Sequence, residues 1–425
     1  MKAGRIHWPS ILQFGLSALG VFALWSGALL FITIGISGYI TGGAEDFVLN
    51  DPLQLFMLAV GYAAIGILAL PSAYYALWHV LDLRAIDFRP ALAKLEPALW
   101  IVAFPLVLLV GYWVSSISMV AWLVLPFMHL LAVGLPLAWI LYLSIRSLPF
   151  GSPQRMWGVI TSGLLLAPTM ALFLEGLVGV VFVLFGVLYI SRSPDLVDQI
   201  SRFTEWMNLA NPSPELLFDK IGPMMVHPVV ILLVIFYGAV AVPLIEEALK
   251  PIGVWLLVGK KLSPAAGFVA GAMSGAAYAL CESLVLTSDG QQWVSMMVAR
   301  IGTAIIHIFT SGLVGWALVQ ARYKRTYVLL GVSYLVAVLI HGLWNALTLF
   351  STFSVLAILH GLQPPFAFIS YMGWIAPFGL VFLTIATFIT LLVTNRSLGH
   401  SRIKAKGSGL LVNGTESLDI GESVL

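Results

Sequence analysis

The stretch Pro243-Leu244-Ile245-Glu246-Glu247-Ala248-Leu249-Lys250-Pro251 lies inside an apolar run that extends from Val229 to Val258. This run is long enough to cross a bilayer core, which takes roughly 20 residues. Each charged side chain at the centre of a membrane helix costs about 2.5 to 3.5 kcal/mol on insertion scales. Two carboxylates and an ammonium so close together therefore predict polar partners and a water-filled cavity.

The spacing of these charges predicts a shared helical face. Glu246 lies four residues before Lys250 and Glu247 lies three before it, and both separations bring side chains together on a helix. Pro251 has no N–H to offer the carbonyl group of Glu247, so the helix is expected to bend beside the acids. A buried charge cluster that only ties helices together is the alternative to a functional site.

The composition is that of a membrane protein. The chain has 425 residues, of which 60% are hydrophobic and 9% are charged, whereas soluble domains carry about 25% charged residues. The sequence therefore predicts an all-α, polytopic transmembrane helical bundle. The single cysteine, Cys281, excludes an intrachain disulfide, and the lack of a basic block argues against nucleic-acid binding.

Apolar runs predict about ten spans. The run after Lys2 and Arg5 is too long for a signal-peptide segment, so it is expected to remain as an uncleaved first span. The predicted spans cover about 11–40, 54–80, 98–115, 119–145, 157–190, 229–258, 264–287, 293–320, 327–350 and 369–394.

The loops predict the orientation in the membrane. Every loop after an even-numbered span is basic, as Arg146 and Arg155 after the fourth span and Lys260 and Lys261 after the sixth illustrate. Positive charge favours the cytoplasmic side, so both termini are predicted to be cytoplasmic, in an integral protein of the plasma membrane.

Four regions are predicted along the chain. Residues 191–228 form the longest connection, and Ser193-Pro194-Asp195 is typical of a helix start. This external loop is expected to hold an interfacial amphipathic helix, either a lid or a structural connector. The regions are 1–190, a five-span helical region; 191–228, the external loop; 229–395, a catalytic transmembrane core; and 396–425, a disordered cytoplasmic tail.

Polar residues are concentrated in the second half of the chain. The spans before residue 191 hold His129 and Glu175, each isolated in sequence and interpreted as a packing residue. In the seventh span, glycines at 267, 271 and 275 form a flat face for close helix packing. The same face continues to Tyr278 and Glu282, so the helix that packs tightly also carries a carboxylate.

The eighth and ninth spans add imidazoles at similar depth. Arg300 and His307 are seven residues apart, close to one face of a helix, and His341 and Asn345 are four apart. At about 1.5 Å per residue, the acids after Pro243 and both histidines fall near the middle of their spans. Several helices thus deliver acids, imidazoles and an amide to overlapping depths.

These residue types predict hydrolytic chemistry. Glu246 or Glu247 could activate water as a general base, with Lys250 moderating the second charge. His341 and Asn345 could donate to a developing oxyanion. Alternatively, two histidines and one or two glutamates could hold Zn²⁺ and leave a position for water, although the sequence has no HExxH motif.

The polar motifs resemble those of the PrsW family of intramembrane proteases, itself similar to the type II CAAX prenyl endopeptidases and the Abi proteins. The resemblance covers about 240–350, a range set by matching motif order and spacing. The motifs are Glu246-Glu247-x-x-Lys250, Tyr278-x-x-x-Glu282, the segment from Arg300 to Gly312 with His307 inside it, and His341-Gly342-Leu343-Trp344-Asn345.

The resemblance implies an intramembrane endopeptidase that cleaves single-pass or otherwise membrane-anchored proteins. By analogy with the prenyl endopeptidases, Glu246 and His307 position water, and His341 with Asn345 forms the oxyanion hole. PrsW-like proteins are also described as metalloproteases. The zinc ligands would then come from Glu247, Glu282, His307 and His341, with Tyr278, Lys250 and Arg300 in supporting roles.

Two departures from the family pattern bear on the mechanism. Tyr278 stands where the family usually has Phe, and Asn345 where many members have Asp. Asn is a poor metal ligand and cannot act as a base, which favours the glutamate mechanism. A transporter with a proton or ion path and a non-catalytic pseudoprotease are the competing interpretations. The first half shows no copy of the second, which argues against a transporter.

Overall fold

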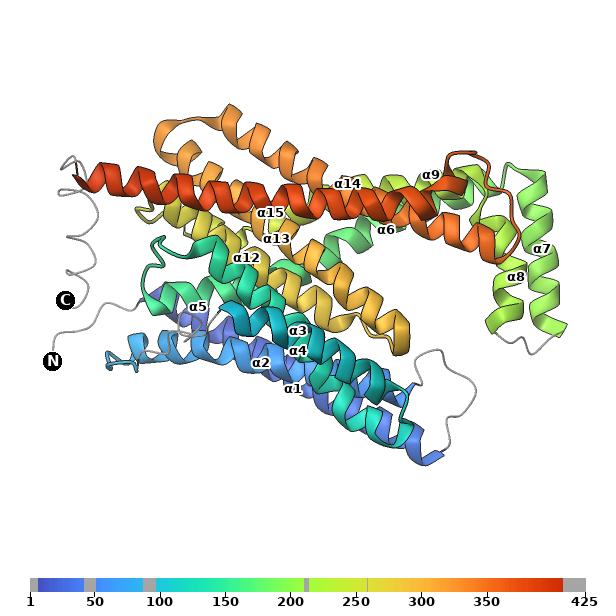
Figure 1. Cartoon of the computed structure of the whole chain (residues 1–425), viewed down its shortest axis with the longest axis horizontal. Coiled ribbons are helices and arrows are strands. Elements are labelled where there is room, and N and C mark those ends of the chain that lie inside the picture. Colours follow the sequence, from blue (N-terminus) through green and yellow to red (C-terminus); the bar gives the residue numbers. More distant parts are fainter. Residues whose placement is uncertain (1–6, 42–50, 87–96, 210–213, 258, 408–425) are drawn as a thin grey trace. The chain divides into compact units, whose positions relative to one another are not determined.

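The computed structural model describes residues 7–41, 51–86, 97–209, 214–257 and 259–407 (Figure 1). Helices are the regular elements of these residues, which contain no strand. The predicted all-α class is therefore confirmed. Two of the elements, η2 and η3, are single turns of π-helix within longer helices.

In chain order the elements are α1 (Trp8–Thr41), α2 (Pro52–Val80), α3 (Pro97–Ser115), α4 (Ser118–Ile145), α5 (Pro153–Thr161), η2 (Ser162–Leu166), α6 (Ala167–Ile190), α7 (Pro194–Leu209), α8 (Pro214–Met225), α9 (Pro228–Phe236), η3 (Tyr237–Ala241), α10 (Val242–Leu249), α11 (Ile252–Trp255), α12 (Pro264–Val285), α13 (Gly290–Lys324), α14 (Tyr327–Leu359) and α15 (Ile369–Gly407).

Several helices begin with proline directly after a capping side chain. Ser152 accepts from the N–H of Arg155 before α5, and Ser263 accepts from that of Ala266 before α12. Asp51 caps α2 in a similar way. Proline suits the first helical position because its missing N–H would have no helical partner there. These pairs set the points at which spans begin.

Nine helical stretches of the described residues are long and apolar enough to cross a membrane. The predicted third span, 98–115, corresponds to α3, whose described apolar part, Val102–Ser115, is shorter than the others. The protein is thus an integral, multi-pass membrane protein. The plasma membrane and the cytoplasmic termini stay predictions.

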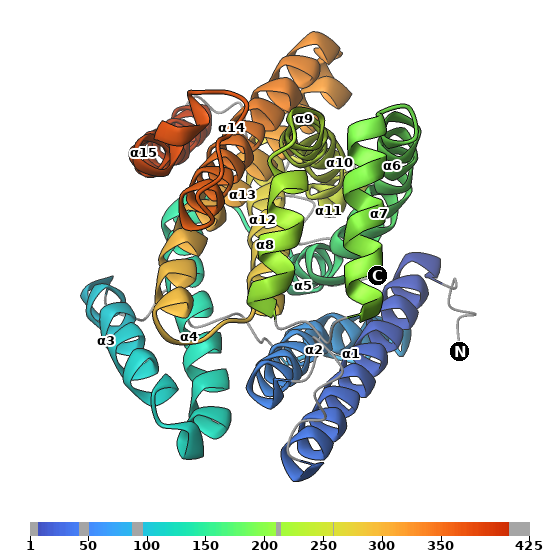
Figure 2. The same cartoon turned by 90° about the vertical axis from the view of Figure 1, so that its right-hand side faces the viewer.

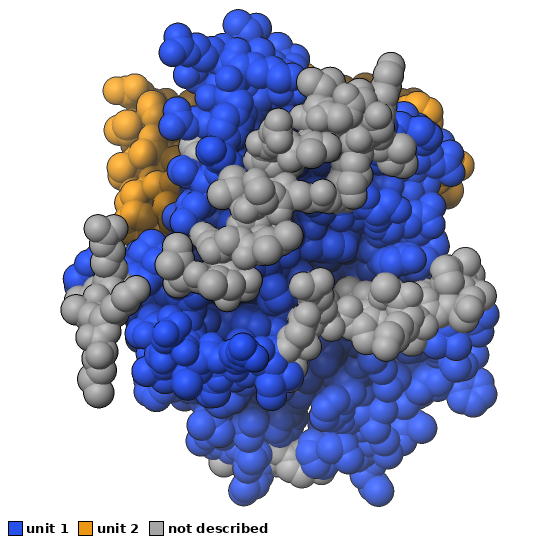
Figure 3. Space-filling view, turned by 90° about the vertical axis from the view of Figure 1, so that its left-hand side faces the viewer, with its two compact units in different colours: residues 1–168, 249–334, 387–425 blue, residues 169–248, 335–386 orange. Residues whose placement is uncertain are grey.

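The chain forms two compact units, coloured separately in Figure 3. Unit 1 combines Met1–Pro168, Leu249–Tyr334 and Thr387–Leu425. Within it, α1 packs along α2, and α12 along α13 (Figure 2), with α4 against both α12 and α13. Trp293 of α13 donates from Nε1 to Nδ1 of the buried His129 of α4 at 3.2 Å, so His129 is a hydrogen-bonded packing residue.

Unit 2 combines Thr169–Ala248 and Leu335–Ala386. Part of its core consists of Val226, Ile231, Phe353 and Ile369, which bring together the start of α9, the end of α14 and the start of α15. The predicted 191–228 connection contains two helices, α7 and α8, rather than one. The first begins at Pro194, where the sequence indicates a helix start.

The two units do not follow the predicted regions in a simple way, because each unit joins segments that are distant in sequence. The division into 1–190, 191–228, 229–395 and 396–425 stays a prediction. One difference is visible at the C-terminal end: α15 continues to Gly407, so the predicted tail begins as helix. Residues 408–425 of that predicted tail lie outside the described residues.

Candidate active site

The helix that carries the paired glutamates is interrupted on both sides of them. A π-helical turn, η3, precedes α10, and α10 ends at Leu249. The chain turns at Lys250 and Pro251 before α11 begins at Ile252. This interruption agrees with the bend expected from Pro251, which cannot donate to a carbonyl in the preceding turn. Single π-helical turns inside α-helices are frequent at functional sites.

Pro243 leaves a carbonyl group of η3 without its helical donor. The N–H of Val242 reaches back five residues to the carbonyl oxygen of Tyr237. In the same register the next residue would donate to Gly238, but that residue is proline. Asn345 of α14 supplies the missing donor, because its Nδ2 lies 2.8 Å from the Gly238 carbonyl oxygen.

Gly342 lets α14 approach the same π-helical turn. A Cβ atom at this position would lie 2.4 Å from the carbonyl oxygen of Ala239, too close for any side chain. The glycine and the amide of Asn345 therefore dock α14 onto two successive carbonyl groups of η3. His341 precedes this glycine, so the docking also sets the height of the imidazole beside α10.

The two glutamates face the two nitrogens of one imidazole. His341 Nδ1 lies 2.9 Å from Glu247 Oε1, and His341 Nε2 lies 3.8 Å from Glu246 Oε2. All three side chains are buried, and that of Glu247 is fully enclosed. We call these residues the Glu247–His341 group. The shorter contact is a charge-assisted hydrogen bond, while the longer one leaves room for a bridging group.

Unit 1 holds a second polar group, and glycines of α12 place it. A Cβ atom on Gly275 would lie 2.2 Å from the carbonyl oxygen of His307, and one on Gly271 would lie 2.1 Å from that of Ser311. Gly267 makes a similar approach to the carbonyl of Gly315. The predicted glycine face is thus the surface on which α12 meets α13, and it fixes the turn that carries His307.

The second group centres on Glu282. Arg300 Nη1 donates to Glu282 Oε1 at 3.1 Å, and Nη2 lies 2.9 Å from Oε2. His307 Nε2 lies 3.0 Å from the same Oε2. Arg300 Nε also donates to Ser283 Oγ at 2.8 Å, so the guanidinium is held on two sides. We call these four residues the Glu282 cluster. A two-point guanidinium–carboxylate pair fixes both charge and orientation.

Aromatic contacts extend the Glu282 cluster along α12. The rings of Tyr278 and His307 have centroids 5.7 Å apart. The fully buried Lys250 places Nζ 5.2 Å from the centroid of the Tyr278 ring, a cation–π contact. The carbonyl oxygen of Lys250, at the break before Pro251, accepts a 2.5 Å hydrogen bond from Ser274 Oγ. The helix interruption is thereby tied to α12.

The structure thus gathers the predicted site residues into two groups, one in each unit. Sequence reasoning missed two serines, Ser283 and Ser274, which hold Arg300 and the Lys250 carbonyl. Serine is common in membrane helices and neither position belongs to a spaced motif. No sequence signal distinguishes them from other serines. The oxyanion role predicted for Asn345 stays a prediction, beside the bond that it makes to Gly238.

Comparison with known proteins gives one match. Residues 216–387 match the model of the PrsW family intramembrane metalloproteases, over less than half of the chain. This match supports an intramembrane protease. No curated protein and no solved structure matches the chain. The matched family differs from the type II CAAX prenyl endopeptidases and the Abi proteins, so the wider resemblance is not supported.

The family description implies a metal ion. The possible ligands in each unit can be compared with the ligands that such an ion requires. A catalytic zinc site usually takes three protein ligands and keeps one position open. Among the described residues, no set of three or more His, Cys, Asp or Glu side chains is arranged to hold an ion. In the Glu282 cluster both carboxylate oxygens already face Arg300. Neither group, taken within its unit, fits a complete zinc site.

Proposed function

We propose that the chain is an intramembrane endopeptidase that hydrolyses a peptide bond of a membrane-anchored protein. The observation that carries this proposal is the Glu247–His341 group, an imidazole held by one buried carboxylate and facing another. The group lies in the stretch that matches the PrsW family. Apolar helices surround it, so the bond that it cleaves would belong to a substrate within the bilayer.

In the proposed reaction, a water molecule bridges Glu246 Oε2 and His341 Nε2. These atoms are 3.8 Å apart, a separation that a water at roughly 2.8 Å from each can span. Glu246 takes a proton from this water as its oxygen attacks the carbonyl carbon of the scissile bond. The same proton then passes to the leaving amine, which completes hydrolysis. Glu247 orients the imidazole through Nδ1.

Asn345 is the proposed donor to the oxyanion that forms during this attack. Its amide group has two N–H bonds, and the hydrogen bond to Gly238 uses one of them. The second remains for the developing negative charge. A donor anchored in this way is preorganised, which is the condition under which such groups stabilise a transition state.

The Glu282 cluster is proposed to act as a positioning group. Arg300 balances the charge of Glu282, and Glu282 orients His307 through Nε2. The proposed task of His307 is to help position water, as the sequence resemblance suggests. Tyr278 and Lys250 support the cluster through their ring contacts.

A metal-dependent reaction is the second candidate, favoured by the description of the matched family. Its ligands would be drawn from Glu247, Glu282, His307 and His341, with Zn²⁺ as the metal. Elemental analysis of the purified protein and cleavage with and without a chelator separate the candidates. Stoichiometric zinc together with loss of cleavage on chelation would replace the glutamate mechanism.

The function itself is tested by reconstituting the full chain in liposomes with a single-pass model substrate. Cleavage within the membrane segment, found by mass spectrometry of the products, is the expected result. Glu175→Gln is the matched control for Glu246→Gln, because Glu175 lies in α6 of the same unit and outside the family match. Ion flux without cleavage, and sensitive to Glu246→Gln, would support a transporter instead.

A further inference from the structure

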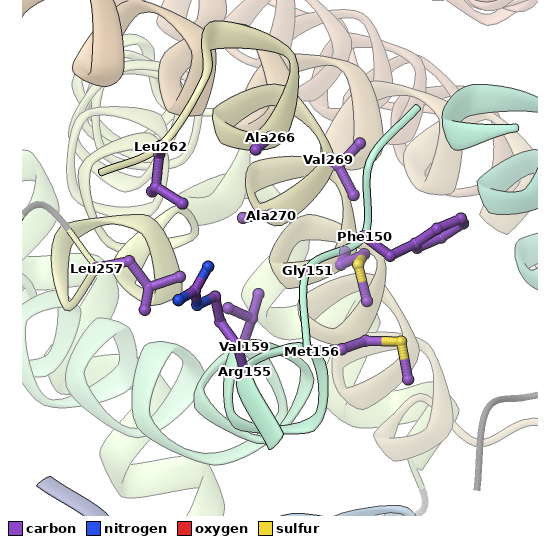
Figure 4. Close-up of a pocket in the computed structure, with 11 residues that line it drawn as sticks. Phe150, Gly151, Arg155, Met156, Val159, Leu257, Leu262, Ala266, Val269 and Ala270 are labelled. Carbon is purple, nitrogen blue, oxygen red and sulfur yellow. The ribbon is translucent and has the colours of Figure 1, made fainter. Parts of the chain in front are cut away.

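Unit 1 contains a cleft that the proposed reaction does not use. It is lined by eleven residues and is partly open to the surface. Apolar side chains from α5, α12 and the segment between α11 and α12 form most of the wall, among them Met156, Val159, Leu257 and Val269. Figure 4 shows the guanidinium group of Arg155 between these walls. An apolar cleft with one cation is therefore present on unit 1.

The side chain of Arg155 does not stabilise the helix that carries it. It lies in the first turn of α5, where its N–H is capped by Ser152. A positive charge near a helix start opposes the helix dipole, so it weakens rather than supports α5. Its guanidinium has no acidic partner in the described part of the chain. The charge is available for a ligand.

The sequence around the cleft carries positive charge and no negative charge. Residues 146–168 and 249–274 supply its walls and contain no Asp or Glu. They do contain Arg146, Lys260 and Lys261, which are exposed. Such a surface attracts anions, and a partner with a negative group is what the cleft can accommodate.

Local backbone features shape the two sides of the cleft. On one side, Gly151 adopts a positive φ of 75° in the turn that leads into α5. On the other, the hydroxyl of Tyr323 donates to the carbonyl oxygen of Lys260 at 2.6 Å and accepts from the N–H of Leu262 at 3.1 Å. The loop before α12 is thus fastened to α13 on this side of the cleft.

The cleft lies where membrane-spanning segments end. Its residues lie in, or just before, the first halves of the spans Pro153–Ile190 and Pro264–Val285, and Leu257 follows the end of Pro228–Trp255. Span ends lie near the level of lipid headgroups. At this level a guanidinium meets phosphate, with which it forms two-point hydrogen bonds. The apolar walls next to it meet acyl chains.

We propose that this cleft binds an anionic phospholipid. The lipid phosphate pairs with Arg155, and an acyl chain lies along Met156, Val159 and Val269. The site is separate from the proposed hydrolysis, and it requires no particular orientation of the protein in the membrane. Its ligand is a lipid and not a free anion, because the larger part of the cleft surface is apolar.

Native mass spectrometry of the full chain with added phosphatidylglycerol or phosphatidylcholine tests the proposal. The wild type is expected to retain phosphatidylglycerol in preference to phosphatidylcholine. Arg155→Gln should weaken that binding by about tenfold, as expected for the loss of a charge-assisted contact. Arg146→Gln is the matched control, since it removes an exposed positive charge from the loop that leads into α5 without touching the cleft.

A second variant tests the apolar part of the site. Ala266→Leu keeps Arg155 but fills the cleft, which Ala266 lines, and it should also reduce phosphatidylglycerol binding. Equal effects of Arg146→Gln and Arg155→Gln, or equal retention of both lipids, would overturn the proposal. Competition by inorganic phosphate at lipid-like concentration would point to an anion site and overturn it too. If Arg155→Gln does not fold, the proposal is tested by Ala266→Leu and by the preference of the wild type for phosphatidylglycerol over phosphatidylcholine.

Discussion

The Glu282 cluster and the Glu247–His341 group each pair a carboxylate with an imidazole, but their backbones differ. Glu282 and His307 stand on α12 and α13, which are continuous helices packed through glycines. Glu246 and Glu247 stand on the short α10, between a π-helical turn and the break at Pro251. The Glu282 cluster is therefore carried by continuous helices, which we call its regular support. The paired glutamates of the Glu247–His341 group are carried by an interrupted helix, which we call the interrupted support.

The charge environment differs in the same sense. The guanidinium of Arg300 contacts both carboxylate oxygens of Glu282 and also donates to the hydroxyl of Ser283. The contact between Glu246 and His341 is longer, at 3.8 Å. A carboxylate held at two points by a guanidinium is suited to fixed positioning, whereas one that faces an imidazole across a gap is suited to bind and activate water. The comparison agrees with the proposal that the Glu247–His341 group carries out the chemistry, while the guanidinium of Arg300 fixes the charge within the Glu282 cluster.

Glu246→Gln is expected to have the largest effect on activity. Gln keeps the shape of the side chain but cannot take a proton, so cleavage should fall by about 10²- to 10⁴-fold with folding intact. Glu175→Gln is the control, and thermal stability checks the fold of both variants. The assignment is reversed if Glu282→Gln abolishes cleavage while Glu246→Gln does not.

Asn345→Ala should have the next largest effect. It removes the donor to Gly238 and the proposed donor to the oxyanion, and loss of one oxyanion donor typically costs about 10²- to 10³-fold in rate. Asn345→Asp should be no more active, because a carboxylate cannot donate and repels a developing negative charge. Thr348→Val, one turn away on α14, is the control.

The Asp variant also separates the two mechanisms. Activity at or above the wild-type level in Asn345→Asp, lost on addition of a chelator, would contradict the glutamate mechanism. It would indicate a metal site in which an acid at position 345 improves binding.

The sequence predicted much of the fold because membrane helices follow directly from apolar length. It also predicted the break at Pro251 and the glycine face of α12, since each depends on one local property, a missing N–H or a missing side chain. The predicted third span stays a prediction, because α3 has a shorter described apolar part than the other spans.

Other features depend on contacts that sequence spacing does not encode. Ser283 meets Arg300 across 17 positions of the chain, and Asn345 meets the Gly238 carbonyl across 107. Pro243 indicates that one backbone carbonyl group loses its hydrogen-bond donor. It does not indicate that the helix adopts a π-helical turn, so that the carbonyl without a helical donor is that of Gly238. Which distant side chain satisfies such a carbonyl is decided by packing.

Gly275→Ala probes the regular support of the Glu282 cluster. The new methyl group would meet the His307 carbonyl at 2.2 Å and two atoms of Ser311 at 2.6 and 2.7 Å. Overpacking of this kind costs up to about 3 kcal/mol in the free energy of unfolding. Gly134→Ala in α4 has open space around it and should change stability by less than about 1 kcal/mol.

Gly342→Ala makes the same change on the interrupted support. Its methyl group would meet one close atom, the Ala239 carbonyl oxygen at 2.4 Å, whereas the methyl group at position 275 would meet three. It should therefore lower the melting temperature less than Gly275→Ala but lower cleavage more, because it displaces His341. If both variants lose stability and activity in the same proportion, the proposed difference between the two supports is wrong.

Ser283→Ala should have the smallest effect. It removes the acceptor for Arg300 Nε but leaves both guanidinium contacts with Glu282. Loss of one hydrogen bond to a charged group costs about 1.5 kcal/mol, which a thermal unfolding series in detergent can resolve. Ser295→Ala, on the exposed side of α13, is the serine control and should be neutral. Because the hydroxyl is the group that matters, Ser283→Thr should restore stability.

If Ser283 positions Arg300 for the reaction as well, Ser283→Ala should also lower cleavage per folded molecule and Ser283→Thr should recover it. A loss of stability without any change in cleavage would show that Ser283, and its contact with Arg300, has only a structural role.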